Sequence, residues 1–318
     1  MRIIFLILAF FVCGYCFAQT ESRRDFANEI TIAIDNDIFL FDDWYYTAGH
    51  EISYRKLLGN RQSLAKLITQ TNVPSKAIVS FNLGNKIFTP KRTQFANPIN
   101  MDRPYAGFEY GSISISRLKG QRIVSSLEFE IGLIGKATGL GKLQQWWHTK
   151  TGLEEPRGWD TQIANEVVFN MNYRYERNFK IVKYIDLVST SGVFVGTGSN
   201  KIAQDLTVRL INFNPVTESV FSNNRLAFKG NQGKEEVFIF GGIGIDYVIS
   251  NIFLEGSLFK NNQSFFTVDA TPWVLRRNFG IMYARNRGSF ALSINNLAKE
   301  VAKGSGHSYV RLAFSQRF

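Results

Sequence analysis

The chain has 318 residues, with 37 Lys and Arg against 26 Asp and Glu, so its formal net charge is +11. Hydrophobic residues make up 45% of it, yet after the N-terminal segment no run reaches the ~18 apolar residues of a membrane helix, which excludes a helical membrane protein. The positive charge could indicate nucleic-acid binding. However, an exported chain without a clustered basic helix favours anionic lipid or lipopolysaccharide as the partner.

Residues 1–18 have the pattern of a secretory signal peptide. Arg2 precedes an apolar run, Ile3–Val12, and a small residue stands at the expected cut. Roughly ten apolar residues are too few for a membrane anchor of about 20, and Cys13 and Cys16 form no convincing lipoprotein motif. Because both cysteines fall in this segment, the mature chain, 19–318, has no disulfides and no thiol chemistry.

Period-two alternation recurs along the mature chain. Leu127, Phe129 and Ile131, for example, alternate with Glu128 and Glu130. A soluble sandwich also alternates, but here the second face repeatedly carries Gly, Ser, Asn, Glu and Arg, which suits a polar lumen with lipid outside. We therefore expect an all-β fold, a transmembrane antiparallel β-barrel over residues 19–318, located in the bacterial outer membrane.

Thirteen segments are strand candidates in chain order: 28–40, 45–57, 77–89, 104–118, 122–135, 164–178, 183–197, 201–212, 235–248, 251–259, 273–287, 289–297 and 308–318. A bacterial single-chain barrel has an even number of strands. We therefore expect twelve, with one of the late candidates wrong. The final candidate is amphipathic and ends on Phe318, the pattern that such barrels present to the barrel-assembly machinery.

Three connections differ from tight turns. Segment 57–76 is expected to be a longer turn with one helical stretch, and 136–163 is not strand-like. Segment 213–234 falls on the periplasmic side by strand count. Because long loops usually lie outside, the direction of the strands after the seventh stays open.

Polar clusters at separate strand ends converge on one rim. Both termini of such barrels are normally periplasmic, so odd strands run outward and even strands run inward. The outer rim then receives Asn36-Asp37, Tyr46 to Gly49, Thr89 to Arg92, Asp102 to Tyr105, and segment 136–163. This convergence predicts a functional site at the extracellular rim.

The rim segment 136–163 contains a predicted helix, Leu140–Thr151, which lacks Pro and is followed by a glycine. Gln144 and His148 share a face of that helix at i,i+4. A lone histidine is more often structural than catalytic. Glu154 six residues later, and Asp37 on the same rim, favour catalysis.

These residue types suit ester hydrolysis. The reaction needs a base for water and positive charge at the developing oxyanion. The sequence has no Gly-x-Ser-x-Gly motif and no mature cysteine, so His148 acting on water with a hard cation is an economical solution. Carboxylates of Asp37 and Glu154, with a carbonyl near Thr47, favour Ca²⁺ over zinc. On the residues alone, solvated rim charges at Asp37 and Glu154 remain the alternative.

Motifs across the mature chain resemble the LpxR family of outer-membrane lipid A 3′-O-deacylases. The spacing Gln-x-x-x-His-x-x-x-Gly-x-Glu is the most specific part. The matching residues are Asn36-Asp37, Tyr46-Thr47-Ala48-Gly49, Thr89-Pro90, Asp102-Arg103-Pro104-Tyr105-Ala106-Gly107, Gln144, His148, Gly152, Glu154, Pro156, Trp159, Asp160 and Gln162.

The resemblance implies a twelve-stranded barrel with its site near the outer leaflet. It implies His148 as the general base, Glu154 as its acidic companion, and Asn36, Asp37 and Thr47 in the calcium and substrate site. The family has an active-site lysine after the third strand. Lys91 and Arg92 lie near that point at a different spacing, so either residue could take the role. Arg103 and Gln144 complete the expected supporting set.

Two other functions compete with lipid A deacylation. One is a non-catalytic outer-membrane channel or structural barrel. The other is phospholipase-type deacylation with a serine nucleophile, for which no serine has a convincing histidine partner by spacing. For the deacylase we expect lipid A or lipopolysaccharide and outer-membrane lipids as partners, no nucleic acid, and a monomeric barrel.

Overall fold

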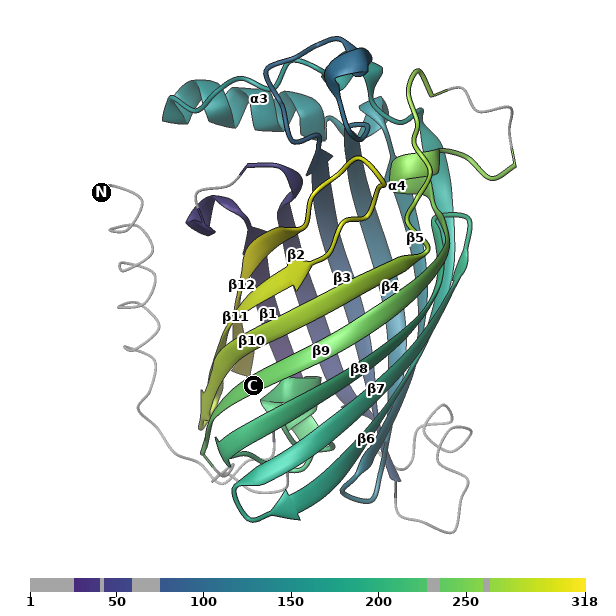
Figure 1. The fold of residues 1–318 in the computed structure, drawn as a ribbon. Coiled ribbons are helices and arrows are strands. Elements are labelled where there is room, and N and C mark those ends of the chain that lie inside the picture. Colours follow the sequence, from purple (N-terminus) through teal and green to yellow (C-terminus); the bar gives the residue numbers. More distant parts are fainter. Residues whose placement is uncertain (1–25, 41–42, 59–74, 228–234, 260–263) are drawn as a thin grey trace.

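The computed structural model describes residues 26–40, 43–58, 75–227, 235–259 and 264–318, which form a closed antiparallel barrel (Figure 1). Twelve strands follow one another in chain order, and β1 closes the barrel against β12. The expected twelve-stranded β-barrel is therefore confirmed. The strands are β1 (Asn28–Asn36), β2 (Tyr45–Leu58), β3 (Ser75–Thr89), β4 (Ala106–Lys119), β5 (Ile123–Ile134), β6 (Glu166–Val182), β7 (Ile185–Gly196), β8 (Ser199–Asn212), β9 (Glu236–Asn251), β10 (Trp273–Arg285), β11 (Gly288–Leu297) and β12 (His307–Arg317).

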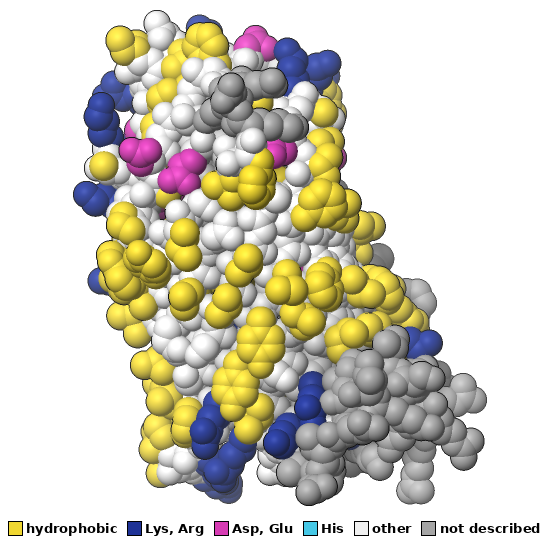
Figure 2. Space-filling model, turned by 90° about the vertical axis from the view of Figure 1, so that its right-hand side faces the viewer, with side chains coloured by type: hydrophobic (Ala, Val, Ile, Leu, Met, Phe, Trp, Pro, Cys, Tyr) yellow, Lys and Arg dark blue, Asp and Glu magenta, His cyan; other side chains and the backbone are white. Residues whose placement is uncertain are grey.

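The strands are apolar on the outside and polar on the inside. In β1, Ile30, Ile32 and Ile34 are exposed on the outer wall, whereas Thr31 and Asp35 are buried in the lumen. Figure 2 shows hydrophobic side chains spread over the visible wall, with Lys and Arg at its lower end and near its upper end. A closed barrel pairs the backbone groups between strands, so this arrangement suits a lipid environment.

The surplus strand candidate is 251–259, and that prediction is wrong. The side chain of Asn251 accepts the N–H of Phe253 and begins a short helix, α4 (Ile252–Glu255), which ends at Gly256 with φ 74°. Ile252 is buried with Phe108 in an apolar cluster at the mouth of the lumen. The segment therefore closes the mouth and adds no strand to the wall.

The segment after β8 lies at the end of the barrel where β1 begins and β12 ends, which we call the terminal end. Two 3₁₀ turns, η5 (Val220–Ser222) and η6 (Arg225–Ala227), follow β8 there, as the strand count placed them. Val216 and Leu226 are buried against inward side chains of the wall, namely Ile78, Leu118, Val124 and Val188. Residues 213–227 thus form an apolar plug in the lumen, and the alternation of strand directions holds through β12.

At the opposite end, the outer rim, the connections are helical. The first candidate strand was too long, because β1 stops at Asn36 and η1 (Ile38–Leu40) follows. Segment 136–163 contains no strand and includes α3 (Leu140–Thr151), which stops at Gly152 with φ 74° as predicted. Short 3₁₀ turns complete the rim: η2 (Pro98–Asn100), η3 (Lys136–Thr138) and η4 (Trp159–Thr161).

Two expectations fall outside the described residues. The first is the signal peptide, residues 1–18. The second is the helical stretch expected within 57–76, because most of that segment, 59–74, is not described. Within the described ranges, no helix is long and apolar enough to cross a membrane.

Candidate functional site

Helix α3 presents one face to the rim, and its contacts fix where His148 stands. Gly141, Gln144 and His148 are buried on that face. A Cβ at Gly141 would lie only 2.6 Å from the Trp159 ring, so the helix packs closely there. One turn later, the indole N–H of Trp159 donates to Oε1 of Gln144 over 3.0 Å. His148 follows one further turn along the same face, held by the same packing.

The imidazole of His148 is oriented by the chain that follows α3. Nδ1 lies 2.5 Å from the backbone carbonyl oxygen of Glu154, and the ring is only 3% exposed. Because a carbonyl oxygen can only accept, Nδ1 carries the hydrogen in the neutral ring and Nε2 keeps its lone pair. Nε2 faces Oδ2 of Asp43 at 3.7 Å, beyond hydrogen-bond distance. The Nε2 lone pair is thus directed at the Asp43 carboxylate across a short gap.

A second group of oxygens lies beside this histidine, at the outer ends of β1 and β2. The hydroxyl of Thr47 lies 3.1 Å from Oδ1 of Asp37 and 2.7 Å from Oδ1 of Asp43. Oδ2 of Asp37 accepts the backbone N–H of Trp44 at 2.8 Å. The backbone carbonyl of Thr47 accepts the N–H of Asp37 at 3.2 Å. These bonds hold two carboxylates against one hydroxyl.

The charge in this group is not balanced by the described protein atoms. Burial, followed by the nearby Asp43 carboxylate, raises the pKa of Asp37 to about 8. Asp37 is only 1% exposed. One hydroxyl hydrogen of Thr47 faces two carboxylate oxygens and can satisfy only one of them fully. A positive charge at this point would therefore be strongly favoured.

The sequence placed Asp37, Thr47, His148 and Glu154 on one rim, and the structure brings them together through Asp43. Sequence reasoning missed Asp43. The available signal was the acidic pair Asp42-Asp43 between two of the predicted residues; of the pair, only Asp43 is described. The Glu154 carboxylate was expected at the ion, but its side chain is exposed, and its backbone carbonyl makes the contact with His148.

A comparison with protein families decides the identity of this barrel. The family model of the outer membrane protein LpxR matches residues 4–318. The chain belongs to the LpxR family. It is thus a member of a family of outer-membrane β-barrels, as the sequence indicated.

One solved structure agrees on the fold. LpxR from Salmonella typhimurium superposes with a TM-score of 0.72 at 20% identity, covering 91% of this chain and 100% of that one. The β domain of the Bordetella autotransporter BrkA gives a TM-score of 0.45 at 8% identity, covering 93% of this chain and 100% of that one. No curated protein matches the chain.

Whether the LpxR-family rim could hold calcium depends on its donors. The Thr47 hydroxyl lies within hydrogen-bond distance of the Asp37 and Asp43 carboxylates, and all three residues present hard oxygen atoms, the donor type that Ca²⁺ prefers. The raised pKa of Asp37 shows that this position favours positive charge, and together with the single shared hydroxyl hydrogen it fits a divalent cation. Among the described residues no cluster of three His, Cys, Asp or Glu side chains has metal-site spacing. The third oxygen here belongs to a threonine, which such a cluster does not include.

Three of the predicted supporting residues surround this group. Oδ1 of Asn36 accepts the N–H of Ile38 at 2.8 Å, so Asn36 shapes the turn that carries Asp37. Nζ of Lys91 lies 5.3 Å from the Trp44 ring centroid and 2.9 Å from Oγ of Ser305. Arg92 is exposed beside it. Lys91 is therefore the basic residue that the described contacts connect to the site.

Arg103 supports the mouth of the barrel from within. Its guanidinium is 1% exposed, donates to Oε2 of Glu300 over 3.1 Å, and stacks 4.9 Å from the Phe88 ring centroid. Gln144 has a comparable role in the helix contact with Trp159. Both belong to the scaffold that positions the site.

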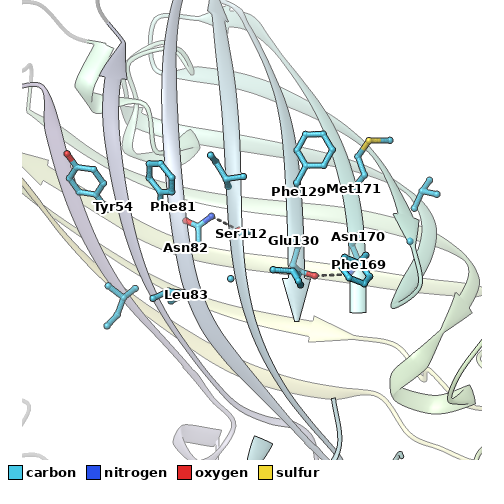
Figure 3. A pocket seen from close by; sticks show the side chains of 16 residues that line it. Tyr54, Phe81, Asn82, Leu83, Ser112, Phe129, Glu130, Phe169, Asn170 and Met171 are labelled. Carbon is cyan, nitrogen blue, oxygen red and sulfur yellow. Dashed lines mark hydrogen bonds between the residues drawn. The ribbon is translucent and has the colours of Figure 1, made fainter. Parts of the chain in front are cut away.

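A hollow of about 870 Å³ lies elsewhere, on the outer wall across β2–β7. Figure 3 shows its lining, which includes Phe81, Phe129 and Met171. Glu130 also borders it, but its carboxylate accepts from Nδ2 of Asn170 at 2.7 Å. The hollow is apolar and offers no base or electrophile for hydrolysis.

Proposed function

We propose that this chain is a lipid A deacylase that hydrolyses an ester-linked acyl chain, the 3′-O-linked acyloxyacyl group, at its outer rim. The observation that carries the proposal is His148, held through Nδ1 by the Glu154 carbonyl, with Nε2 directed at the acidic group of Asp37, Asp43 and Thr47. Membership of the LpxR family supports the same substrate class.

His148 acts as the general base on water. As the water oxygen attacks the acyl carbon, Nε2 accepts the proton and the ring becomes charged. The Glu154 carbonyl keeps the ring oriented and accepts from Nδ1–H throughout. When the carbon–oxygen bond breaks, the ring returns its proton to the leaving sugar oxygen. The products are a free carboxylic acid and a hydroxyl on the glycolipid.

Asp43 is a positioning residue in this scheme. With its Oδ2 3.7 Å from Nε2, it stabilises the charged imidazole by attraction across a partly buried gap. Its Oδ1 accepts from the Thr47 hydroxyl and holds that arrangement. The proton therefore remains on histidine between the two halves of the reaction.

Asp37, Asp43 and Thr47 are the residues that would hold Ca²⁺. A Ca²⁺ ion held there would supply positive charge for polarising the ester carbonyl and for stabilising the negative charge that develops on its oxygen. Glu154 enters through its carbonyl, and its exposed carboxylate is the least supported of the predicted ligands. Lys91 and Asn36 border the same group and complete the substrate-facing rim.

A channel is the less favoured reading, because apolar side chains are packed in the lumen near both ends of the barrel. The plug packs Val216 and Leu226 on the wall at the terminal end. Ile252 of α4 packs with Phe108 at the mouth. The discriminating experiment is mass spectrometry of lipid A incubated with the detergent-solubilised protein, which detects the loss of one acyl group, alongside conductance in planar bilayers.

A further inference from the structure

The lipid-facing wall is not uniformly apolar beneath the outer rim. On β6, Val167 and Phe169 are exposed at 49% and 56%, so the apolar wall reaches almost to the outer end of the strand. On the side that carries the candidate site, six polar residues occupy outward positions instead: His50, Asn85, Glu109, Arg277, Asn296 and Ser308. We call this set the polar notch.

Strand register makes the polar notch continuous on each side of β1. Arg277 pairs with Asn296, which pairs with Ser308, and Nδ2 of Asn296 donates to Oγ of Ser308 over 2.9 Å. Across β2 to β4, His50 pairs with Asn85 and Asn85 with Glu109. These two rows flank β1, whose outer end leads directly into Asp37.

The outer rim of the barrel is also lowest over β1, β11 and β12. β1, β11 and β12 have 9, 10 and 11 residues, the shortest of the twelve strands. Figure 1 shows the wall ending lower over these strands than over β3 and β4, with α3 above. His148 of α3 meets Asp43 at the start of β2, so the candidate site stands over this dip.

Arg277 is the unexpected member of the polar notch. It shares its outward face with Phe279 and Ile281, exposed at 55% and 40%, and is itself exposed. Along β10 it lies four residues from Trp273, toward the terminal end of the barrel. At ~3.4 Å per residue and ~40° of strand tilt, this places it about 10 Å below the outer end of the strand. Within the described ranges no carboxylate forms an ion pair with it. A cation in a lipid-facing wall is costly without an anionic partner.

We infer that the polar notch binds the phosphorylated headgroup of an outer-leaflet glycolipid, with Arg277 as the residue that binds a phosphate. The charges along the polar notch would orient the bound headgroup, because Arg277 stands at one end of the notch and Glu109 at the other. From Arg277 to β1 are three strand spacings, about 15 Å, a span that a phosphorylated disaccharide can cover. The lipid would thus move sideways out of the membrane through the dip. Its identity as the substrate rests on the proposed function.

The test measures binding separately from turnover. Binding of lipid A, of dephosphorylated lipid A and of inorganic phosphate is measured with protein carrying His148→Ala, which cannot hydrolyse the lipid in the proposed scheme. Into that background are introduced Arg277→Gln, Arg277→Lys and Arg285→Gln. Arg285 is the matched control, exposed on the same face of β10 at its terminal end.

Arg277→Gln should weaken binding of lipid A by about tenfold or more, leave dephosphorylated lipid A unchanged, and be largely rescued by lysine. Arg285→Gln should change nothing. Equal binding of lipid A with and without Arg277, equal loss for both lipids, or Arg277-dependent binding of inorganic phosphate as tight as that of lipid A would overturn the inference. A heat-modifiable gel shift checks that each variant is folded.

The two proposals fail separately. Arg277-dependent binding by a protein that never releases fatty acid would refute the deacylase and leave the notch standing. Normal deacylation kinetics in Arg277→Gln, with unchanged binding, would refute the notch and leave the deacylase standing.

Discussion

Nδ1 of His148 lies 2.5 Å from the backbone carbonyl oxygen of Glu154, six residues later in the chain. This contact ties the last turn of α3 to the loop that follows and leaves Nε2 as the basic nitrogen. The six-residue spacing is therefore important because it brings the backbone carbonyl of residue 154 to the imidazole of His148. A side chain at position 154 is not needed to orient the ring.

Asp43→Asn should lower deacylation by about 10²-fold while the barrel remains folded. The substitution removes the negative charge 3.7 Å from Nε2, so the charged imidazole loses its stabilisation. The measurement is the rate of fatty acid release at saturating lipid A. Asp160→Asn is the control, an exposed acid on the same rim, and it should leave the rate unchanged. Equal rates for wild type and Asp43→Asn would contradict the role given to Asp43.

The dependence of deacylation on Ca²⁺ should be most sensitive to substitution of Asp37. Chelation should abolish deacylation, and Ca²⁺ should restore it better than Mg²⁺, whose smaller octahedral shell fits a flexible oxygen site less well. Asp37→Asn should raise the half-saturating Ca²⁺ concentration about tenfold or more, whereas Glu154→Gln should shift it less. Calcium titrations of activity, and calorimetry of Ca²⁺ binding, measure the shift. A larger shift for Glu154→Gln than for Asp37→Asn would reverse the ligand assignment.

Gly158→Ala should impair activity without unfolding the barrel. A Cβ there would lie 2.3 Å from the methyl carbon of Met101 and 2.4 Å from the Tyr105 ring. The loop must move, and with it the adjacent Trp159 that holds Gln144 of α3. We expect a fall in kcat with a normal heat-modifiable gel shift. An unaltered kcat would show that this packing does not position His148.

A buried ion pair between β7 and β8, next to the plug, should contribute to the stability of the barrel. Arg209 donates from Nε and Nη2 to Asp186, and both side chains are almost fully buried. Arg209→Ala leaves the carboxylate unpaired, which typically costs about 3–5 kcal/mol. Unfolding in urea, followed by loss of the gel shift, measures the change. Lys136→Ala breaks an exposed pair with Asp160 and should have no measurable effect. Equal stability of the two variants would show that this ion pair does not stabilise the barrel.

The sequence was sufficient where a pattern is local or repeats. The period-two alternation identified the barrel, and each of the twelve strands overlaps one of the thirteen candidate segments. Helix α3 was predicted from Leu140 to Thr151 because its glycine stop is a local signal. Segment 251–259 was mistaken for a strand, because Asn251 caps a helix there and strand-like composition does not reveal a cap.

The sequence predicted most of the residues that lie at the site, but not which of their atoms make the contacts. Strand direction brought Asp37 and Thr47 to the same rim as His148. It could not show that Glu154 acts through its carbonyl, since backbone contacts leave no trace in composition. Asp43 was missed because it lies in a connection whose fold the alternation does not specify. Arg103 was expected in the supporting set, but its partner Glu300, against which it is buried within the mouth, was not predicted.

Release of fatty acid from lipid A by purified protein, wild type against His148→Ala, tests the central claim most directly. Mass spectrometry of the remaining lipid identifies the acyl group lost, and the heat-modifiable gel shift confirms that both proteins are folded. We predict that wild type removes one ester-linked acyl group in the presence of Ca²⁺, and that His148→Ala slows this by about 10²–10⁴-fold or more. Full activity of His148→Ala, or no acyl loss with the wild-type protein and Ca²⁺, would contradict the account.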